Sequence, residues 1–119
     1  MRPYNAFETR NVKFLVDQQV EFATIQITAT GLKKSILDAT APVRAYFKEK
    51  GVHDYDLQAQ DPQHKRTVDT YILTDSSCHL TKTSLYRPVT KKGDPRLWVN
   101  KVHNVEFLHA DDIFAFIAH

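Results

Sequence analysis

Hydrophobic and polar positions follow a period of two near the start of the chain. Val12, Phe14 and Val16 fit this period, and a second run covers residues 20–28, where the phase shifts once near Ala23. A period of two is typical of a strand with one buried face, and a single phase shift indicates a bulge. We therefore predict a short strand over 12–16, ended by the polar residues that follow, and a longer bulged strand over 20–28.

Two short helices are predicted near residues 31–50. The first begins after Thr30, a suitable N-cap, and ends by residue 38 or 39 because Pro42 cannot continue it. The second has Thr40 as its N-cap and Gly51 just beyond its last turn, an arrangement typical of helix ends. The apolar stripe of this second helix is formed by Val43, Tyr46 and Phe47.

The remainder of the chain predicts strands. Residues 75–77, Asp-Ser-Ser, have the composition of a hairpin turn. The final run, 113–117, is apolar on both faces and predicts a buried strand, so we expect the chain to be a domain of something longer. Several strands with two early helices predict an α+β, mainly β and mainly antiparallel, fold. The predicted strands are 52–60, 67–74, 79–86, 96–99, 105–108 and 113–118.

The length and composition predict one domain. A chain of 119 residues that is 42% hydrophobic is large enough for one core. The single Cys78 excludes an internal disulfide, which favours a reducing compartment. No apolar run approaches the ~18 residues of a membrane span, and the first residues lack the apolar stretch of a secretory signal. We expect a soluble protein of the cytoplasm.

Positive charge is concentrated in one segment. Residues 82–101 contain six Lys/Arg and one acid, Asp94, whereas the other 99 residues contain ten basic and thirteen acidic groups. Such a segment attracts polyanions even though the formal net charge of the chain is only +2. Gly93 and Pro95 indicate a sharp turn within it. Its candidate binding residues are Arg87, Lys91, Lys92, Asp94, Arg96 and the only tryptophan, Trp98.

These residue types suit DNA. An arginine fork matches two acceptors of a guanine edge, and a lysine holds phosphate as a mobile charge. Asp94 would accept from a cytosine amino group or orient Arg87 or Arg96. The alternative is a solvated hairpin end with Trp98 in the core. A second patch, either DNA-contacting or merely polar, comprises Gln58, Gln60, Gln63, His64, Lys65 and Arg66.

Several catalytic patterns are missing from the sequence. No acid is followed two positions later by lysine, which excludes the Asp/Glu-x-Lys nuclease pattern. There is no glycine-rich phosphate loop and no G-x-S-x-G motif, and one cysteine with scattered histidines does not build a structural zinc site. Residues 53–56, His-Asp-Tyr-Asp, could hold a metal. The alternative is that they are an ordinary segment that leads into a strand.

Three segments carry a resemblance to a known family. They read GLKKSILDATAPVR (31–44), HDYDLQAQDPQHK (53–65) and SLYRPVTKKGDPRLWV (84–99), and the chain closes on DDIFAFIAH. In this order they resemble the N-terminal effector domain of EcoRII/MvaI-related Type IIE restriction endonucleases. The resemblance implies a B3-like pseudobarrel that grips the DNA major groove with two arms. It also implies binding of a duplex 5′-CCWGG-type site in the bacterial cytoplasm.

The same resemblance implies that DNA binding and DNA cleavage belong to separate domains. The domain itself would have no catalysis and no cofactor, and Mg²⁺ is expected only for a separate catalytic domain in the full-length chain. We expect a monomer. The C-terminal arm would be 87–98, with Arg87, Lys91, Lys92, Asp94 and Arg96 facing DNA. The N-terminal arm, shorter here than in the family, would lie around Arg10, Lys13, Asp17, Gln18 and Gln19. A further departure is Asp61, which stands where glycine is usual.

Two alternatives use the same residues differently. One is a small metal-dependent nuclease with a site near His53, Asp54 and Asp56. The other is a module that binds RNA or protein through the basic segment. RNA binding usually involves a row of exposed aromatic side chains for base stacking, and only Tyr86 and Trp98 lie near that segment.

Overall fold

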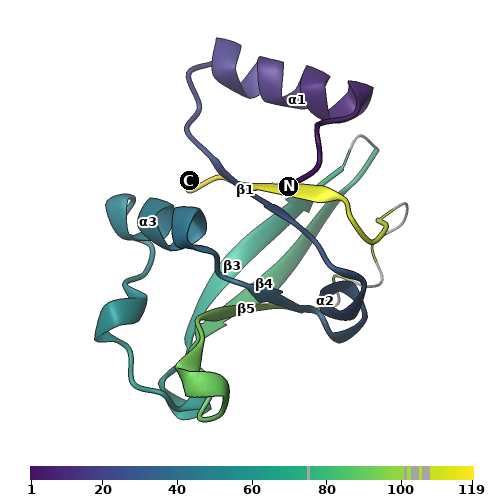
Figure 1. The fold of residues 1–119 in the computed structure, drawn as a ribbon. Helices are drawn as coiled ribbons and strands as arrows, with labels where there is room; N and C mark the ends of the chain where they lie inside the picture. Colours follow the sequence, from purple (N-terminus) through teal and green to yellow (C-terminus); the bar gives the residue numbers. More distant parts are fainter. Residues whose placement is uncertain (75, 101, 103–104, 106–107) are drawn as a thin grey trace.

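The computed structural model describes residues 1–74, 76–100, 102, 105 and 108–119, without the side chains of Pro62 and Lys91 (Figure 1). Its architecture is α+β and mainly antiparallel, as the sequence predicts. The helices are α1 (Ala6–Asp17), α2 (Ala29–Lys34) and α3 (Ala41–Glu49), with 3₁₀ turns η1 (Tyr55–Leu57), η2 (Pro62–His64) and η3 (Lys91–Gly93). The strands are β1 (Ala23–Gln26), β2 (Ile36–Asp38), β3 (Arg66–Leu73), β4 (Cys78–Tyr86), β5 (Arg96–Val99) and β6 (Ile113–Phe116).

The strands form two antiparallel sheets. The larger has the order β2-β5-β4-β3, and the smaller pairs β1 with β6. Within the described residues these sheets are not joined into one closed barrel. In the larger sheet Trp98 lies opposite Ser84 on one side and Ile36 on the other, which fixes the register of its central strands.

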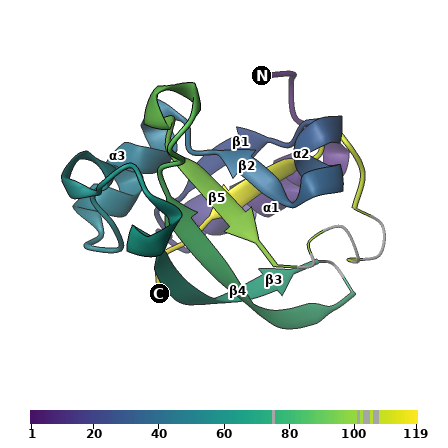
Figure 2. The same ribbon diagram turned by 90° about the horizontal axis from the view of Figure 1, so that it is seen from below.

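The core lies between the two sheets and is extended by α3. Figure 2 looks onto the larger sheet, with β4 and β5 in front of β1, β6 and α1. Side chains alternate across each strand, so β4 and β5 turn one set of residues inward and the other outward. The outward face carries Tyr71, Leu80 and Trp98, which are 65%, 67% and 39% exposed. The most deeply buried side chains are Ile27, Val43, Leu85, Leu97 and Val102.

The predicted strand over 12–16 is wrong, because these residues belong to α1. Both ends of this helix are closed by local hydrogen bonds. At the start, the Asn5 side chain accepts from Glu8 N and the Glu8 side chain accepts from Asn5 N, which is a capping box. At the end, Gln19 adopts a left-handed conformation with φ 58°, and Val20 N donates to Leu15 O, as in a Schellman motif.

Polar contacts connect helix α1 to the rest of the molecule, and none of its residues is fully buried. Arg2 makes a bidentate pair with Glu8, with N–O distances of 2.7 and 2.8 Å. Glu8 also accepts from Ile113 N in β6, and Arg2 N donates to Gln26 in β1. The hydrogen bonds from Arg2, followed by the one from the Asn5 backbone, lower the pKa of Glu8 from 4.5 to about 2, although burial opposes the shift.

Acidification is expected to loosen α1 before the rest of the fold. The stability that the Glu8 carboxylate contributes is present above pH 4.5 and is lost as the pH falls toward 2, because only the unfolded state binds the proton in that window. The contribution is about 1–2 kcal/mol after allowance for solvent screening. Urea titrations followed through α1 amide signals should show this decline between pH 5 and 2.5. Glu8→Gln should remove it, and a decline that survives in Glu8→Gln would assign it to another group.

The first predicted helix ends earlier than expected, because residues 36–38 form β2 and pair with β5. Ser35 ends α2 in a left-handed conformation with φ 60°, and Ser35 O then accepts from Val99 N. The second predicted helix is confirmed as α3: Thr40 is its N-cap residue and Gly51 follows it at φ 71°. Its buried residues are the predicted stripe, Val43, Tyr46 and Phe47.

The predicted hairpin is confirmed by β3 and β4, and the predicted strand 96–99 by β5. The strand predicted over 52–60 is wrong, because η1 and irregular backbone occupy it. Only Ala23–Gln26 of the predicted 20–28 strand is in a ladder. The last run does form β6, but Ala115 is exposed. The strand predicted over 105–108 includes residues outside the described part.

No helix in the described part is long and apolar enough to cross a membrane.

Candidate nucleic-acid interface

Residues 87–95 of the basic segment form a tight loop between β4 and β5, which we call the basic loop. Lys92 and Gly93 take left-handed conformations in succession, at φ 57° and φ 68°, and Gly93 N donates to Thr90 O. Glycine adopts this conformation at no steric cost, whereas lysine does so only where the surroundings fix it. The sharp turn indicated by Gly93 and Pro95 is therefore present at the predicted place.

Arg87 holds this loop closed. Its Nε donates to Gly93 O at 2.9 Å across the loop, and its Nη1 donates to Gln58 O at 3.3 Å. Two of the guanidinium nitrogens are thus committed to backbone carbonyl groups, and the side chain is half-buried. Arg87, predicted to face DNA, has a structural position at the base of the loop.

The segment 58–66 lies beside the basic loop and is organised by Gln58. The Gln58 amide nitrogen donates to His64 O at 2.9 Å and to Leu85 O at 2.8 Å, and its amide oxygen lies 3.0 Å from His53 Nε2. One side chain therefore joins η2 to β4 and to the residues after α3. No local sequence signal distinguishes Gln58 from the other glutamines of this segment, because its contacts depend on how residues 53–64 fold against β4, where Leu85 lies 27 positions away.

Gln60 closes the contact between the two segments. Its side chain lies over Gly93 so closely that a Cβ added there would stand 2.5 Å from Gln60 Cγ. Its amide nitrogen also approaches Lys92 O at 3.5 Å. Residues 58–66 and 87–96 consequently form one continuous surface, which we call the two-loop surface; it lies at the bottom of Figure 1.

Free positive charge is displayed on the two-loop surface. Lys65, Arg66 and Lys92 are exposed, and no ion pair or hydrogen bond to their side chains is present within the described part of the chain. Asp94 is exposed and, among the described side chains, pairs with neither Arg87 nor Arg96. The side chain of Lys91 lies outside the described residues.

Arg96 and Trp98 extend this surface onto the outward face of the larger sheet. Arg96 is half-buried, and its Nε lacks a hydrogen-bond partner among the described residues. The backbone of Arg96 is fixed, because the Tyr55 hydroxyl donates a hydrogen bond to Arg96 O at 2.9 Å. Burial raises the pKa of Tyr55, which keeps this hydroxyl protonated. Trp98 is 39% exposed, so its placement in the core is wrong.

The predicted N-terminal arm does not lie near the two-loop surface. It is part of α1 and of the turn after it, at the opposite end of the molecule in Figure 1. Arg10 lies over the Phe7 ring at 5.4 Å, and Lys13 pairs with Asp17 at 2.7 Å. Gln18 and Gln19, also predicted to be DNA-binding, end the helix through their backbones.

The possible metal site at 53–56 is used for local structure. Asp54 accepts from Asp56 N at 3.0 Å, which caps η1, and its other oxygen lies 3.8 Å from Lys48 Nζ. His53 is turned to Gln58. Over the described ranges, the structure contains no group of three His, Cys, Asp or Glu side chains that could hold a metal.

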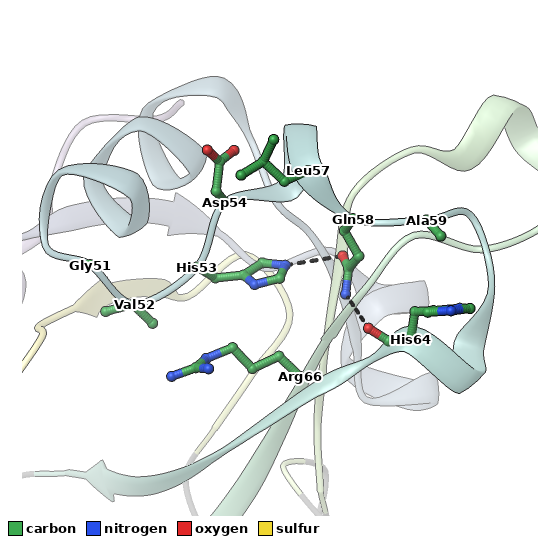
Figure 3. A pocket seen from close by; sticks show the side chains of 9 residues that line it. All are labelled: Gly51, Val52, His53, Asp54, Leu57, Gln58, Ala59, His64 and Arg66. Atoms are coloured by element: carbon green, nitrogen blue, oxygen red, sulfur yellow. Dashed lines mark hydrogen bonds between the residues drawn. The ribbon is translucent and has the colours of Figure 1, made fainter.

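An open hollow of about 450 Å³ lies between the end of α3 and the start of β3 (Figure 3). It borders the two-loop surface because Gln58, Ala59, His64 and Arg66 belong to both. Asp61 shapes the adjoining turn by accepting from Gln63 N at 2.9 Å, so the residue that departs from the family pattern has a local role.

Comparison of the chain with models of protein families, with curated proteins and with solved structures gives no match.

Proposed function

We propose that this domain binds duplex DNA through the two-loop surface. The observation that carries the proposal is the contact of Gln60 with Gly93, because it joins two polar segments into one surface with three exposed cations and no acid paired to them in the described part. Binding to phosphate by Lys65, Arg66 and Lys92 would position the duplex.

Sequence discrimination would come from Arg96 and Asp94 in this proposal. The guanidinium of Arg96 has no side-chain hydrogen bond in the described structure; its Nε is buried, so its two terminal nitrogens would be the donors to the acceptors of a guanine edge. Asp94 is exposed at the tip of the loop, where a carboxylate can accept from a cytosine amino group. Trp98 adds an exposed apolar surface beside them.

The proposal extends to the family resemblance. The domain would be a B3-like effector domain that reads a 5′-CCWGG-type site as a monomer in the bacterial cytoplasm, without catalysis of its own, and Mg²⁺ would be required only by a separate catalytic domain. This extension is supported by the order of the three resembling segments and by a mainly antiparallel fold with short helices early in the chain and a basic loop between β4 and β5.

Two variants are expected to change the affinity for duplex DNA in different ways. Lys92→Ala should weaken binding to a CCWGG duplex and to a scrambled duplex equally, and should reduce the magnitude of the slope of log K against log salt by about 0.9, as expected for one lost phosphate contact. Arg96→Ala should cost about 1–3 kcal/mol on the CCWGG duplex only. Fluorescence anisotropy at two salt concentrations measures both effects. Lys82→Ala, whose cation is already paired with Asp69 at 2.7 Å, is the control.

A second candidate function is supported by the outward face of the larger sheet. Tyr71 and Trp98 are exposed on the same face, with Arg96 beside Trp98 on β5. Exposed aromatic rings next to cations bind single-stranded nucleic acids by stacking. A preference for single-stranded RNA over both duplexes, lost in Tyr71→Ala but not in Lys92→Ala, would favour this function over duplex binding.

A further inference from the structure

The hollow beside the two-loop surface contains two side chains suited to an anion. Arg66, at the first position of β3, is exposed and has no ion pair in the described structure. His53 lies opposite it, half-buried between α3 and η1. Figure 3 shows the Arg66 guanidinium and the His53 ring bordering the same open space. A planar guanidinium matches the oxygen atoms of a phosphate group.

The hydrogen bonds of Gln58 determine which nitrogen of His53 faces this space. The Gln58 amide nitrogen donates to two carbonyl groups, of His64 and Leu85, so its oxygen must be the atom turned to His53. A carbonyl oxygen accepts, and His53 Nε2 therefore carries the proton of that bond. The other ring nitrogen, Nδ1, is left for the hollow, where it becomes a second donor when the ring is protonated.

The one carboxylate that lines the hollow is turned away from it. In Figure 3 the Asp54 oxygen atoms lie on the far side of the His53 ring from Arg66. They are already engaged, one by Asp56 N and the other at 3.8 Å from Lys48. Two further titratable side chains lie near His53 in the described structure: Tyr55, whose ring packs edge-on at 4.5 Å, and His64, which lines the same hollow and is 3.8 Å from Asp61. None of these groups places negative charge between His53 and Arg66.

We propose that this hollow binds one phosphate group between the guanidinium of Arg66 and Nδ1–H of protonated His53. The phosphate is a diester of the DNA backbone adjacent to the two-loop surface, which rests on the proposed function, and a free phosphate ion carries the same chemistry. Because protonation turns Nδ1 from an acceptor into a donor and adds a positive charge, anion binding strengthens on acidification. The contact adds affinity for DNA without sequence preference.

Sulfate is the probe that isolates the site, because its charge stays constant between pH 5.5 and pH 8. Titration of the whole 119-residue protein with sodium sulfate, followed by NMR, should shift the side-chain signals of His53 and Arg66 together. The affinity should be about five- to tenfold higher at pH 5.5 than at pH 8, which is the effect expected of one charge-assisted hydrogen bond.

Three variants test the roles of the two side chains. Arg66→Ala should abolish the sulfate shifts of His53 at both pH values. His53→Gln keeps a donor for the Gln58 oxygen, so it should bind sulfate at pH 8 like the wild type but lose the gain at pH 5.5. Lys82→Ala, a paired cation remote from the hollow, should change neither. Each variant is checked for an unchanged thermal midpoint, and Arg66→Gln, which removes the charge but keeps a long polar side chain, replaces Arg66→Ala if that midpoint falls.

The results separate this site from the proposed function. Sulfate shifts that are absent at both pH values, or that persist in Arg66→Ala, would overturn the site even if duplex DNA binds. A pH dependence retained in His53→Gln, which preserves the other five histidines, would overturn the role of His53. If sulfate binds as expected and duplex binding is unchanged in Arg66→Ala, the site takes free phosphate and the backbone contact is wrong. If sulfate binds and no duplex binds, the site stands and the proposed function fails.

Discussion

Replacing Arg87 with alanine is expected to weaken binding to CCWGG and scrambled duplexes by the same factor, tenfold or more, and to lower the free energy of unfolding by about 1.5–3 kcal/mol, the range for hydrogen bonds from a charged donor. The reason is its position. Its guanidinium joins Gly93 O to Gln58 O, so its loss separates the two segments whose contact creates the surface. Urea denaturation measures the stability, and anisotropy with the two duplexes measures the binding.

Lys92→Ala is the matched comparison for Arg87→Ala. It removes one positive charge from the same loop, but the side chain is exposed and has no partner in the described structure, so stability should not change. A loss confined to the CCWGG duplex in Arg87→Ala, at unchanged stability, would show that Arg87 reads a base and that its two backbone contacts contribute little.

Gly93→Ala is expected to disrupt the surface from its other side. The residue has φ 68°, where a side chain costs about 1–2 kcal/mol, and the added Cβ would collide with Gln60. We expect a total loss of about 2–3 kcal/mol in the free energy of unfolding, with part of it from displacing Gln60. The affinity for duplex DNA should fall about tenfold because the Gln60 side chain no longer packs on the loop and the two segments shift relative to each other.

Gly51→Ala separates backbone strain from the contact. Gly51 has nearly the same conformation, φ 71°, but an added Cβ there meets no atom within 4 Å among the described neighbours. The stability loss should be about 1–2 kcal/mol, with duplex binding unchanged. Equal binding losses in Gly51→Ala and Gly93→Ala would show that general destabilisation, and not the Gln60 contact, determines binding.

Elements specified by nearby residues were predictable from the sequence. Helix α3 has its N-cap residue, its stripe and its glycine within twelve positions, and the β3–β4 hairpin has turn residues between two runs of strand-forming type. Helix α1 was missed although Asn5 and Glu8 have capping-box spacing. The period-two run at Val12, Phe14 and Val16 outweighed that signal, and in the structure Phe14 and Val16 are exposed, so their pattern does not reflect burial.

The candidate site was predictable only in part. The basic loop and the polar segment 58–66 were each identified from composition, but their contact depends on Arg87 and Gln58, which are 29 positions apart. Residues 36–38 similarly became a strand because β5 offers a pairing edge, which no local pattern reveals. The arm placed around Arg10 and Lys13 followed from the resemblance, and the position of α1 is set by the contacts of Arg2 with Glu8 and β1.

The two-loop surface is assembled without ion pairs between the groups that join its segments. Gln58 and Gln60 are uncharged, and Arg87 donates to backbone carbonyl groups and not to carboxylates. Dissolved ions screen exposed charge pairs strongly but have little effect on dipolar contacts such as these, of which the Gln58 and Arg87 contacts are also partly buried. The scaffold of this surface therefore keeps its shape from low salt to high salt. A decline in DNA affinity over that range would report the counterions released from phosphate, undistorted by loosening of the protein.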